Sequence, residues 1–437
     1  MIIYKKSKYY TITDSINVNG IEKKILYSTR SGKILHLDSV VANNFIENRL
    51  DQIPSYELEK LKEDLFVINN SINELSEVLK ENIEINQQNK NLYFVIQPSS
   101  YCQLGCSYCG QTHKKDRLTN ELSDKILDRI SSKIKPKYNN LSITWYGAEA
   151  LTGLNQIKYL SPKIQKLAID KKLKYNSEMI TNGLGLKKEI CQKLISEYNI
   201  RHFKITLDGL ANTHNKSRPT KKGANTFDII LNNIIAINDL SDFFTLTIRT
   251  NINIHNASEV FSLIDLLASH NLQKRVLLEF IPIVDWGENK ASKDSFKPKD
   301  FSDLQIKLFL HSLENGFKFN SFIPKRRGEP CMATNIDYEV FDTDGNIFPC
   351  YEFPLTESHN KSENLINNFF DNNEDNKDVK LREWNKTFMN EEYWCKNCNF
   401  LPVCGGSCPK SWHENIPPCP PFKYNMEERL ILDQFIE

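Results

Sequence analysis

The 437-residue sequence lacks an excess of either charge, because 56 lysines and arginines stand against 55 aspartates and glutamates. This balance gives no support for a polyanionic partner such as nucleic acid. The sequence also lacks long apolar runs: its start, MIIYKKSKYYTITD, is unlike a signal peptide, and no stretch is long enough to span a bilayer. We therefore expect a cytoplasmic protein with neither a membrane nor a nucleic-acid partner.

Cysteine, in contrast, is plentiful, and its eleven positions are clustered. In a reducing cytoplasm, clustered cysteines favour metal binding over disulfides. Three of them lie within residues 101–110, YCQLGCSYCG, and seven fall in the last quarter of the chain. Cys191 stands alone in a helical pattern and is interpreted as a buried structural thiol.

The apolar pattern divides the chain into three regions. Residues 1–91 predict a small α+β domain with alternating strand patterns, a hairpin turn at 30–32, helical patterns over 39–50, 55–68 and 71–83, and a polar linker, EINQQNKN. Residues 92–291 repeat a strand-then-helix rhythm that predicts an α/β fold with a parallel sheet or barrel. Its six strand patterns are LYFVIQ, LSITWYG, NSEMIT, HFKITLD, FFTLTIRTNI and RVLLEFIPI, with five helix patterns between them. Residues 292–437 are irregular and cysteine-dense; we expect them to fold around metal, with NLINNFFDNNEDN as a solvated loop.

The first cysteine cluster follows the first strand pattern, at the strand end where such folds gather functional groups. Thiolates of Cys102, Cys106 and Cys109, on one short loop, can hold three irons of a 4Fe–4S cubane and leave the fourth iron open. The alternative is a zinc site with His113 as a further ligand. The CxxxCxxC spacing, with an aromatic residue before the last cysteine, resembles the signature of radical S-adenosylmethionine (SAM) enzymes. This resemblance implies a partial (β/α)6 TIM-like barrel, catalytic roles for the three cysteines, and a place for Tyr108 near the adenine.

The stretch WYGAEAL after the second strand is similar to the family's Gly-Gly-Glu-Pro stretch, which binds the methionine end of SAM. The similarity implies that Gly147 and Glu149 contact SAM, with the carboxylate of Glu149 taking the amino group. Ala148 and Ala150 stand where the family has its second glycine and its proline. The alternative for Glu149 is a surface carboxylate at a strand end.

After the fourth strand, ITLDGLANTHNKSRP resembles a stretch of SAM-dependent enzymes that modify peptides and proteins. The resemblance implies that Thr206 approaches the ribose and that the guanidinium of Arg218 pairs with the SAM carboxylate. Asn182 and Asn251 lie at further strand ends; Asn182 is a candidate SAM contact, although such residues more often cap turns.

The C-terminal cysteines resemble the SPASM domain, an accessory module that carries two auxiliary iron–sulfur clusters. By that resemblance the outer 4Fe–4S cluster is bound by Cys395, Cys398, Cys404 and Cys419, and the inner one by Cys331, Cys350 and Cys408. Seven thiolates leave the inner cluster one ligand short, so we hypothesise an open position that receives a substrate thiolate or another donor. Structural zinc knuckles, with His413, are the alternative.

The family reduces SAM to a 5'-deoxyadenosyl radical, which abstracts a hydrogen from an unactivated carbon. The resemblance implies a maturase that installs a thioether, carbon–carbon or ether cross-link in a ribosomally made precursor peptide. It also implies an external electron donor such as flavodoxin or ferredoxin. Alternatives are oxidation of a Cys or Ser in a protein, as in anaerobic sulfatase maturation, peptide epimerisation, or a non-catalytic zinc or electron-transfer protein.

Two features favour a peptide substrate over a sulfatase. Sulfatase maturases begin almost directly at the barrel and place an acidic base after the cysteine that corresponds to Cys350, where this chain has Tyr351. Residues 1–91 are similar to domains that bind a precursor's leader, which an exposed strand edge could do by β-augmentation. A packing module that stabilises the barrel is the alternative. Nearby polar candidates for a proton acceptor are Tyr351, Glu352 and Asp285.

Overall fold

The computed structural model describes residues 3–436, apart from 19, 242, 287–288, 360–361, 372, 385 and 387–392. The chain forms two compact units. Unit 1 comprises residues 1–88, 319–334 and 383–437, and unit 2 comprises residues 89–318 and 335–382. The cysteine-rich segment that the sequence predicts as one domain therefore contributes to both units. The three-domain division stays a prediction.

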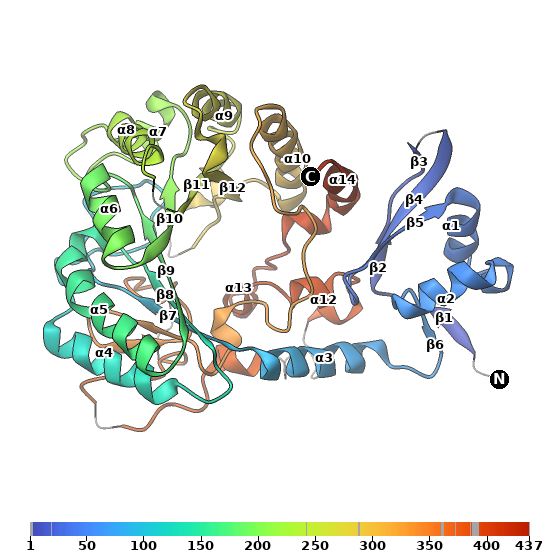
Figure 1. Cartoon of the computed structure of the whole chain (residues 1–437), viewed down its shortest axis with the longest axis horizontal. Coiled ribbons are helices and arrows are strands. Elements are labelled where there is room, and N and C mark those ends of the chain that lie inside the picture. The colour runs from blue at the N-terminus through green and yellow to red at the C-terminus, as the bar shows by residue number, and fades with distance from the viewer. Residues whose placement is uncertain are drawn as a thin grey trace. The chain divides into compact units, whose positions relative to one another are not determined.

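Unit 2 is built on a nine-stranded sheet in the order β12-β11-β10-β9-β8-β7-β13-β14-β15 (Figure 1). Strands β7 to β12 are parallel and follow each other in chain order, which confirms the six predicted strands of a partial barrel. Their bounds are β7 Asn91–Ile96, β8 Asn140–Trp145, β9 Lys174–Thr181, β10 Ile200–Thr206, β11 Thr245–Ile252 and β12 Val276–Pro282.

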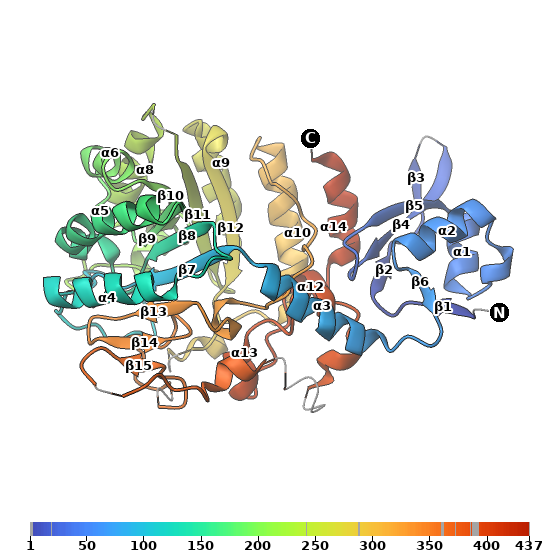
Figure 2. The same ribbon diagram turned by 60° about the horizontal axis from the view of Figure 1, so that its bottom comes forward.

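Helices connect these strands and lie along one face of the sheet, as Figures 1 and 2 show from two directions. They confirm the five helix patterns predicted between the strands. The helices of unit 2 are α4 Asn120–Lys133, α5 Leu154–Asp170, α6 Lys188–Ser196, α7 Ala211–Ser217, α8 Phe227–Asn238, α9 Glu259–Ser269 and α10 Pro298–Glu314. Cys191 lies in α6 with no exposed surface, in agreement with a structural thiol.

The two faces of this sheet differ in polarity, because side chains alternate along each strand. One row of register partners, Trp145, Met179, Phe203 and Leu246, is fully buried. The neighbouring row carries Thr144, Glu178, His202 and Thr245 and is joined by hydrogen bonds, such as Thr144 Oγ1 to Glu178 Oε1 at 2.5 Å. A parallel sheet buried on both faces normally has apolar residues in both rows. This sheet therefore carries a row of polar side chains, bonded to one another, on the face opposite the apolar row.

The short strands β13 Glu339–Phe341, β14 Asn346–Phe348 and β15 Asn367–Asn368 extend the sheet where the sequence predicts irregular structure. β13 pairs in parallel with β7, and β14 and β15 add to it in antiparallel fashion. Arg129 of α4 fixes this extension, since its guanidinium bonds Glu339 Oε1 at 2.6 Å and Asp375 Oδ2 at 2.6 Å. The asparagine-rich segment is therefore partly strand and not simply a solvated loop.

Replacing Arg129 by alanine is expected to lower the free energy of unfolding by about 2–4 kcal/mol, because it leaves the buried carboxylate of Glu339 with one cation fewer. Lys133 Nζ, at 2.8 Å from Glu339 Oε1, keeps the loss from being larger. Urea unfolding followed by circular dichroism measures the change. Lys166→Ala, which removes an exposed pair with Asp170, is the control and should leave the midpoint unchanged.

Unit 1 contains a small antiparallel sheet in which β4 Ile21–Ser28 pairs on one side with β2 Tyr10–Ile12 and β3 Ile16–Val18, and on the other with β5 Ile34–Asp38. The predicted hairpin turn joins β4 to β5, with Gly32 at φ +75°. The remaining elements are β1 Tyr4–Lys6, β6 Val67–Asn69, α1 Ser39–Ile46, α2 Ser55–Glu63, α3 Glu74–Gln88, α12 Leu401–Cys404, α13 Pro409–His413 and α14 Met426–Leu432.

Alternation along β4 explains why unit 1 joins both ends of the chain. Leu26 faces a core with Phe45 of α1 and Phe66, whereas its neighbours Ile25 and Tyr27 face a second core with residues of the cysteine-rich segment. That second core includes Phe400, Val403, Met426 and Leu430. The N-terminal strands thus have an apolar partner on each face.

Two predictions for residues 1–91 are wrong in detail. The helix predicted over 55–68 ends at Glu63, because Leu65 takes a left-handed conformation at φ +60° and Val67–Asn69 pairs with β1 instead. The predicted linker EINQQNKN is mostly helical, since α3 continues to Gln88. Glutamate, glutamine and asparagine here continue a helix that the apolar pattern had already started.

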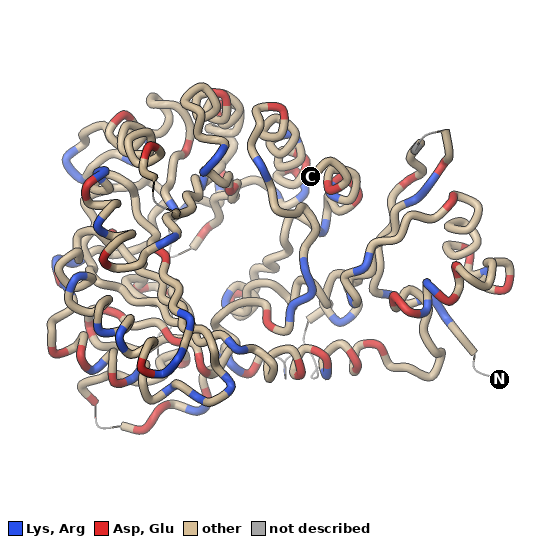
Figure 3. The backbone as a smooth tube through the Cα atoms, in the orientation of Figure 1, with Lys and Arg blue, Asp and Glu red and all other residues tan. Residues whose placement is uncertain are grey.

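Basic and acidic residues are interspersed along both units (Figure 3). Among the described residues, no helix has the length and apolar character needed to cross a membrane.

Candidate SAM and iron–sulfur site

The carboxyl ends of the parallel strands in unit 2 carry most of the residues predicted to form a site. The loop with Cys102 follows β7, Glu149 follows β8, Asn182 follows β9, and Asp208 and Asn251 belong to the ends of β10 and β11. Parallel strands bring these ends to a common edge of the sheet. The fold therefore places residues 80 or more positions apart within contact, as the following distances show.

Glu149 is the centre of a first cluster, with only 1% of its surface exposed. Its carboxylate accepts hydrogen bonds from Thr181 Oγ1 at 2.6 Å and from the backbone nitrogen of Asn182 at 2.7 Å. Asn182 Nδ2 in turn lies 3.7 Å from Cys102 Sγ. Burial raises the pKa of Glu149, and these hydrogen bonds oppose the shift. The carboxylate is thus held in one orientation beside the first cysteine, and the surface alternative for Glu149 is wrong.

Tyr108 is the centre of a second cluster at the ends of β10 and β11. Its hydroxyl donates to the carboxylate of Asp208 and accepts from Arg218 Nη1 at 2.6 Å and Asn251 Nδ2 at 3.0 Å. Asp208 also accepts from the backbone nitrogen of Asn251 at 3.0 Å. The ring of Tyr108 is thereby anchored, while its predicted place near an adenine stays a prediction.

Asp208 is a site residue that the sequence analysis does not predict, although it lies in the stretch ITLDGLANTHNKSRP. The signal for it is a carboxylate just after a strand, followed by a glycine. In the structure Asp208 is fully buried and lies 3.9 Å from Arg218 Nη1. Its backbone nitrogen donates to His214 Nδ1 at 3.2 Å, so the histidine of the same motif orients the turn.

Comparison with known protein families matches residues 96–267 to the Radical SAM superfamily. Residues 96–267 are a radical SAM domain. The chain is therefore an enzyme that contains a radical SAM domain, and SAM and a 4Fe–4S cluster are the cofactors expected at that domain.

Two of the proteins that are similar in sequence are sulfatase-maturating enzymes. The chain is 24% identical over 368 residues to the cysteine-type anaerobic sulfatase-maturating enzyme of Clostridium novyi (strain NT), covering 75% of this chain and 90% of that protein. It is 21% identical over 370 residues to the serine-type enzyme of Bacteroides thetaiotaomicron, covering 74% of this chain and 83% of that protein.

Solved structures share the fold. Native anSMEcpe with bound AdoMet superposes with a TM-score of 0.60 at 19% identity, covering 79% of this chain and all of that chain (100%). Streptococcus suis SuiB bound to precursor peptide SuiA gives a TM-score of 0.51 at 17% identity, covering 95% of this chain and 98% of that chain.

The three cysteines of the radical SAM domain lie close enough to influence one another's ionisation. Burial raises the pKa of Cys102 to about 12, with further contributions from Glu149 and from Cys106. Burial also raises the pKa of Cys106, to which Cys109 adds and which Arg218 opposes. A cubane spreads its thiolates over separate irons, so its ligands need not converge on one point. In the described part of the chain, no three His, Cys, Asp or Glu side chains form a group suited to a single metal ion.

Arg218 fits a SAM carboxylate, because its guanidinium is buried and still has a free donor. Its Nη1 is engaged with Tyr108, whereas its Nε is buried without a hydrogen-bond partner among the described residues. An unpaired buried donor costs free energy unless a ligand satisfies it. Thr206 ends β10 opposite Arg249, and no hydrogen bond of its side chain to another predicted site residue is seen in the described ranges.

The backbone after β8 shows how the chain accommodates Ala148 where the family has its second glycine. Gly147 has φ +110° and Ala148 has φ +46°, so alanine takes the left-handed conformation that a glycine would adopt more easily. The backbone nitrogen of Ala148 donates to Gln111 Oε1 at 3.2 Å. The departure from the family's Gly-Gly pattern therefore changes a side chain without losing the turn.

Single substitutions at Ala148 and at Gly147 should have opposite effects on stability. Ala148→Gly is expected to keep SAM binding and to change the free energy of unfolding by no more than about 1 kcal/mol, towards stability, because it relieves left-handed strain. Gly147→Ala should destabilise the protein and weaken SAM binding, because its Cβ would lie 2.6 Å from Gln97 Nε2 at a strained φ. Thermal unfolding and SAM titration measure both; equal behaviour of the two variants would contradict the interpretation.

The zinc alternative for the cysteine trio involves His113, whose Nε2 lies 4.0 Å from Cys109 Sγ. Burial and the charge of Lys221 lower the pKa of His113 to about 4, so the ring is neutral. Metal analysis, described below for the C-terminal cysteines, distinguishes iron from zinc here as well.

The C-terminal cysteines of unit 1 form two groups. Burial is the largest cause that raises the pKa values of Cys395, Cys404 and Cys419, to about 12 for Cys395 and Cys404. Electrostatic repulsion from Cys398 raises the pKa of each of these three thiols further. The pKa of Cys331 is raised to about 12, first by burial and also by Cys408. Cys350 belongs to unit 2, and its grouping with Cys331 and Cys408 stays a prediction.

The three candidate proton acceptors differ in placement. The rings of Tyr351 and Tyr146 meet edge to face with centroids 5.3 Å apart, which places Tyr351 beside the residue before Gly147. Burial, and then the carboxylate of Glu352, raise the pKa of Tyr146. Asp285 is exposed. The structure thus brings Tyr351 and Glu352 to the end of β8.

Proposed function

We propose that the protein is a radical SAM maturase with SPASM-type auxiliary clusters that cross-links a ribosomally made precursor peptide. The observation that carries this proposal is the pair of buried clusters at the strand ends: Cys102 with Glu149 and Asn182, and Cys106 with Tyr108 and Arg218. They unite thiolates, a fixed carboxylate and a spare guanidinium donor, which suit the cluster, the amino group and the carboxylate of SAM. The bond formed is a thioether, carbon–carbon or ether link.

Bound SAM, given one electron by the iron–sulfur cluster, would supply hydrogen-atom abstraction from the substrate, and the residues of the chain would position the reactants for it. Arg218 Nε would take the SAM carboxylate, while Glu149 would hold its amino group. Asp208 and Asn251 keep the hydroxyl of Tyr108 in place, so that the group of side chains around Tyr108 is rigid before SAM binds. An external flavodoxin or ferredoxin is the proposed electron source.

Two observations favour a peptide over a sulfatase as the substrate. Tyr351 replaces the acidic residue expected after the cysteine in sulfatase maturases, and it is fixed against Tyr146. The fold of SuiB, solved with a precursor peptide, covers 95% of this chain, whereas that of anSMEcpe covers 79%. The sulfatase-type alternative is supported by two of the sequence relatives, which are sulfatase-maturating enzymes.

The test uses reconstituted protein, SAM and a reductant under anaerobic conditions, with two classes of substrate offered separately. The first class comprises the precursor-like peptides encoded beside the gene, each tested alone. The second is a segment of a sulfatase that contains its target Cys or Ser. Loss of two hydrogens from a precursor peptide, located by fragmentation, supports cross-linking. Conversion of the sulfatase residue alone would replace the proposal with the alternative, and inversion without a mass change would identify an epimerase.

Removal of the outer auxiliary cluster should separate the two halves of the reaction. In a Cys395→Ala/Cys398→Ala variant we expect about four irons fewer per chain and loss of peptide product, because a 4Fe–4S cluster needs thiolate ligands. Cleavage of SAM should persist, since Cys102, Cys106 and Cys109 are unchanged. Iron, zinc and 5'-deoxyadenosine are measured together; zinc in place of iron would support the zinc-knuckle alternative.

A further inference from the structure

Arg249 lies on the face of the large sheet that carries the polar row. Along β10, Thr206 lies four positions after His202. Along β11, Arg249 lies four positions after Thr245, the register partner of His202. Even spacings keep side chains on one face of a strand, so Thr206 and Arg249 share the face of the polar row. They are also register partners of each other, which places Arg249 beside a predicted SAM contact.

The guanidinium of Arg249 is fixed at one nitrogen and open at the others. Its Nε donates to Asn251 Oδ1 at 2.9 Å, and the residue is half-buried. Its two Nη groups form no hydrogen bond and no ion pair with any residue that the structure describes. A guanidinium is always charged and only donates, so these groups can serve only an acceptor. Arg249 thus offers a fixed, positively charged fork to a ligand on this face.

Acidic residues beside Arg249 are engaged with other partners. Glu279 is its register partner on β12, but the carboxylate of Glu279 pairs with Lys204, whose Nζ lies 3.0 Å from Oε2 and 3.1 Å from Oε1. The carboxylate of Asp208 is bonded to the hydroxyl of Tyr108. A charge taken partly out of water is favourable only when an opposite charge or another partner compensates it. Within the described chain, Arg249 is therefore a cation without a carboxylate of its own.

Two further carboxylates of unit 2 also form no ion pair with Arg249 among the described residues. Glu178 belongs to the row of Thr245, which lies about 13 Å before Arg249 along β11. Glu352 acts on Tyr146: burial, and then the charge of Glu352, raise the pKa of Tyr146, and the charge of Arg249 opposes this rise. The open guanidinium is therefore within electrostatic range of Tyr146, at the strand ends where the site residues gather.

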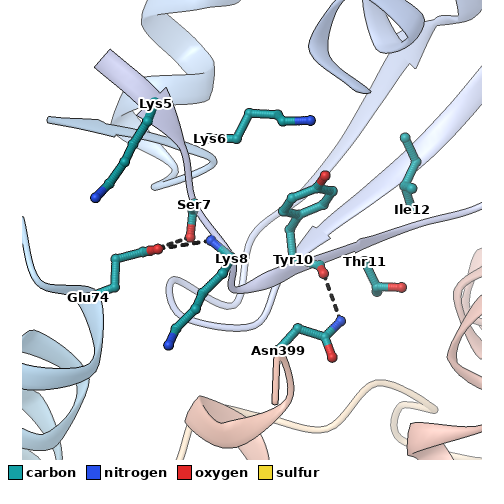
Figure 4. Close-up of a pocket in the computed structure, with 9 residues that line it drawn as sticks. All are labelled: Lys5, Lys6, Ser7, Lys8, Tyr10, Thr11, Ile12, Glu74 and Asn399. Carbon is teal, nitrogen blue, oxygen red and sulfur yellow. Dashed lines mark hydrogen bonds between the residues drawn. The ribbon is translucent and has the colours of Figure 1, made fainter. Parts of the chain in front are cut away.

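Two polar side chains that line a cavity of unit 1 show the contrasting case (Figure 4). The cavity, of about 710 Å³, lies among residues around β1 and β2. Glu74 accepts from the backbone nitrogen of Lys8 at 2.9 Å. Asn399 Nδ2 donates to the Tyr10 carbonyl oxygen at 3.0 Å. Both side chains have partners within the chain, whereas the Nη groups of Arg249 have none among the described residues.

We propose that Arg249 binds a carboxylate of the substrate, an inference that deepens the proposed function and rests on it. A guanidinium fork and a carboxylate match in charge and in geometry, because two parallel N–H donors meet two oxygens. Thr206 is predicted to approach the ribose of SAM, so a carboxylate on Arg249 lies beside the residue to be modified. It is the side chain of an Asp or Glu near that residue, or the C-terminus of the peptide. Arg249 thus determines which substrate residue faces SAM.

The test measures binding of three tripeptides to the reconstituted, SAM-loaded protein by anaerobic calorimetry. They are acetyl-Ala-Glu-Ala amide, acetyl-Ala-Gln-Ala amide, and acetyl-Ala-Ala-Ala with a free C-terminal carboxyl group. The wild type should bind an acidic tripeptide about tenfold or more tightly than the Gln tripeptide, as expected for one charge-assisted contact. Preference for the Glu tripeptide places the carboxylate on a side chain, and preference for the free acid alone places it at the C-terminus.

Three variants test whether Arg249 causes this preference. Arg249→Gln should abolish it, and Arg249→Lys should keep part of it, because lysine keeps the charge but loses the fork. Arg201→Gln is the matched control and should keep the full preference. Arg201 Nε also bonds an asparagine, Asn199 Oδ1 at 2.9 Å, but at the opposite, exposed end of β10. A graded loss at Arg249 alone separates carboxylate binding from unfolding.

Equal affinity of the wild type for acidic and neutral tripeptides, or binding of none of them, would overturn the inference. So would an equal loss of SAM affinity and peptide affinity in Arg249→Gln, because Arg249 would then hold the carboxylate of SAM. Acid-selective binding without modification of any precursor peptide would count against the proposed function alone. Modification of a precursor peptide that persists after its acidic residues are replaced and its C-terminus is amidated would count against the role of Arg249 alone.

Discussion

Alanine in place of Cys102 is expected to abolish 5'-deoxyadenosine formation, at least a thousandfold below the wild-type rate. The residue loses the thiolate for one iron of the cluster, and electron delivery to SAM depends on that cluster. Cys102 is buried, with Asn182 Nδ2 3.7 Å from its Sγ, and the nearby Cys106 and Cys109 cannot replace it because each is itself a predicted ligand. Anaerobic incubation with SAM and a reductant, followed by chromatography of the nucleoside, measures the loss.

Cys191→Ala is the matched control for this experiment. Cys191 is as buried as Cys102 but lies in α6, outside the cysteine clusters. Its replacement should leave nucleoside formation and iron content unchanged. If the Cys102→Ala variant formed 5'-deoxyadenosine at the wild-type rate, the assignment of Cys102 as an iron ligand would be wrong. Loss of 5'-deoxyadenosine formation in both variants would point to unfolding.

The second large effect is expected at Arg218. Arg218→Gln should raise the KM for SAM about a hundredfold or more, because it removes a charge-assisted hydrogen bond to the SAM carboxylate and one of the two arginine charges that act on Asp208. Arg218→Lys keeps the charge but not the planar fork of the guanidinium. Its KM for SAM is expected to lie between those of the wild type and of Arg218→Gln. Binding of SAM by calorimetry separates this effect from electron transfer.

Arg201→Gln provides the control, since Arg201 lies on the same strand, β10, and is exposed. Its KM for SAM should equal that of the wild type. The assignment would be contradicted if the Arg218 variants bound SAM normally. A merely structural role would lower the unfolding temperature of both Arg218 variants without the graded order of KM.

The core of unit 2 could be predicted because its signal is local. Each of the six parallel strands is a short apolar run followed by an amphipathic helix, and both periodicities are visible within a dozen residues. Cys102 and Glu149 can be predicted from motifs that follow a strand, and Asn182 from its place at a strand end, because the fold brings such ends together. Their contacts, such as Asn182 with Glu149 at 2.7 Å, are consequences of that topology.

The short strands β13 to β15 could not be predicted, because their signal is not local. β13 is three residues long and pairs with β7, which precedes it by more than two hundred positions. Its partner for Glu339 is Arg129, on a helix that the sequence shows as an ordinary amphipathic one. A pairing of this kind depends on tertiary context and not on propensity.

The turn after β8 shows a second limit. Ala148 has a residue type that normally indicates helix, yet it occupies a left-handed position at φ +46°. Only the fixed positions of Gly147 and of Gln111, which accepts from the Ala148 nitrogen, show that the turn is kept.

The most direct test of the maturase is anaerobic co-expression with each short open reading frame beside its gene, followed by mass spectrometry of the peptides. A parallel culture carries the Cys102→Ala protein. The account predicts one peptide that loses a hydrogen pair with the wild-type enzyme and keeps its mass with the variant. Unchanged masses for every peptide, in cells where the protein still produces 5'-deoxyadenosine, would contradict cross-linking of a precursor peptide.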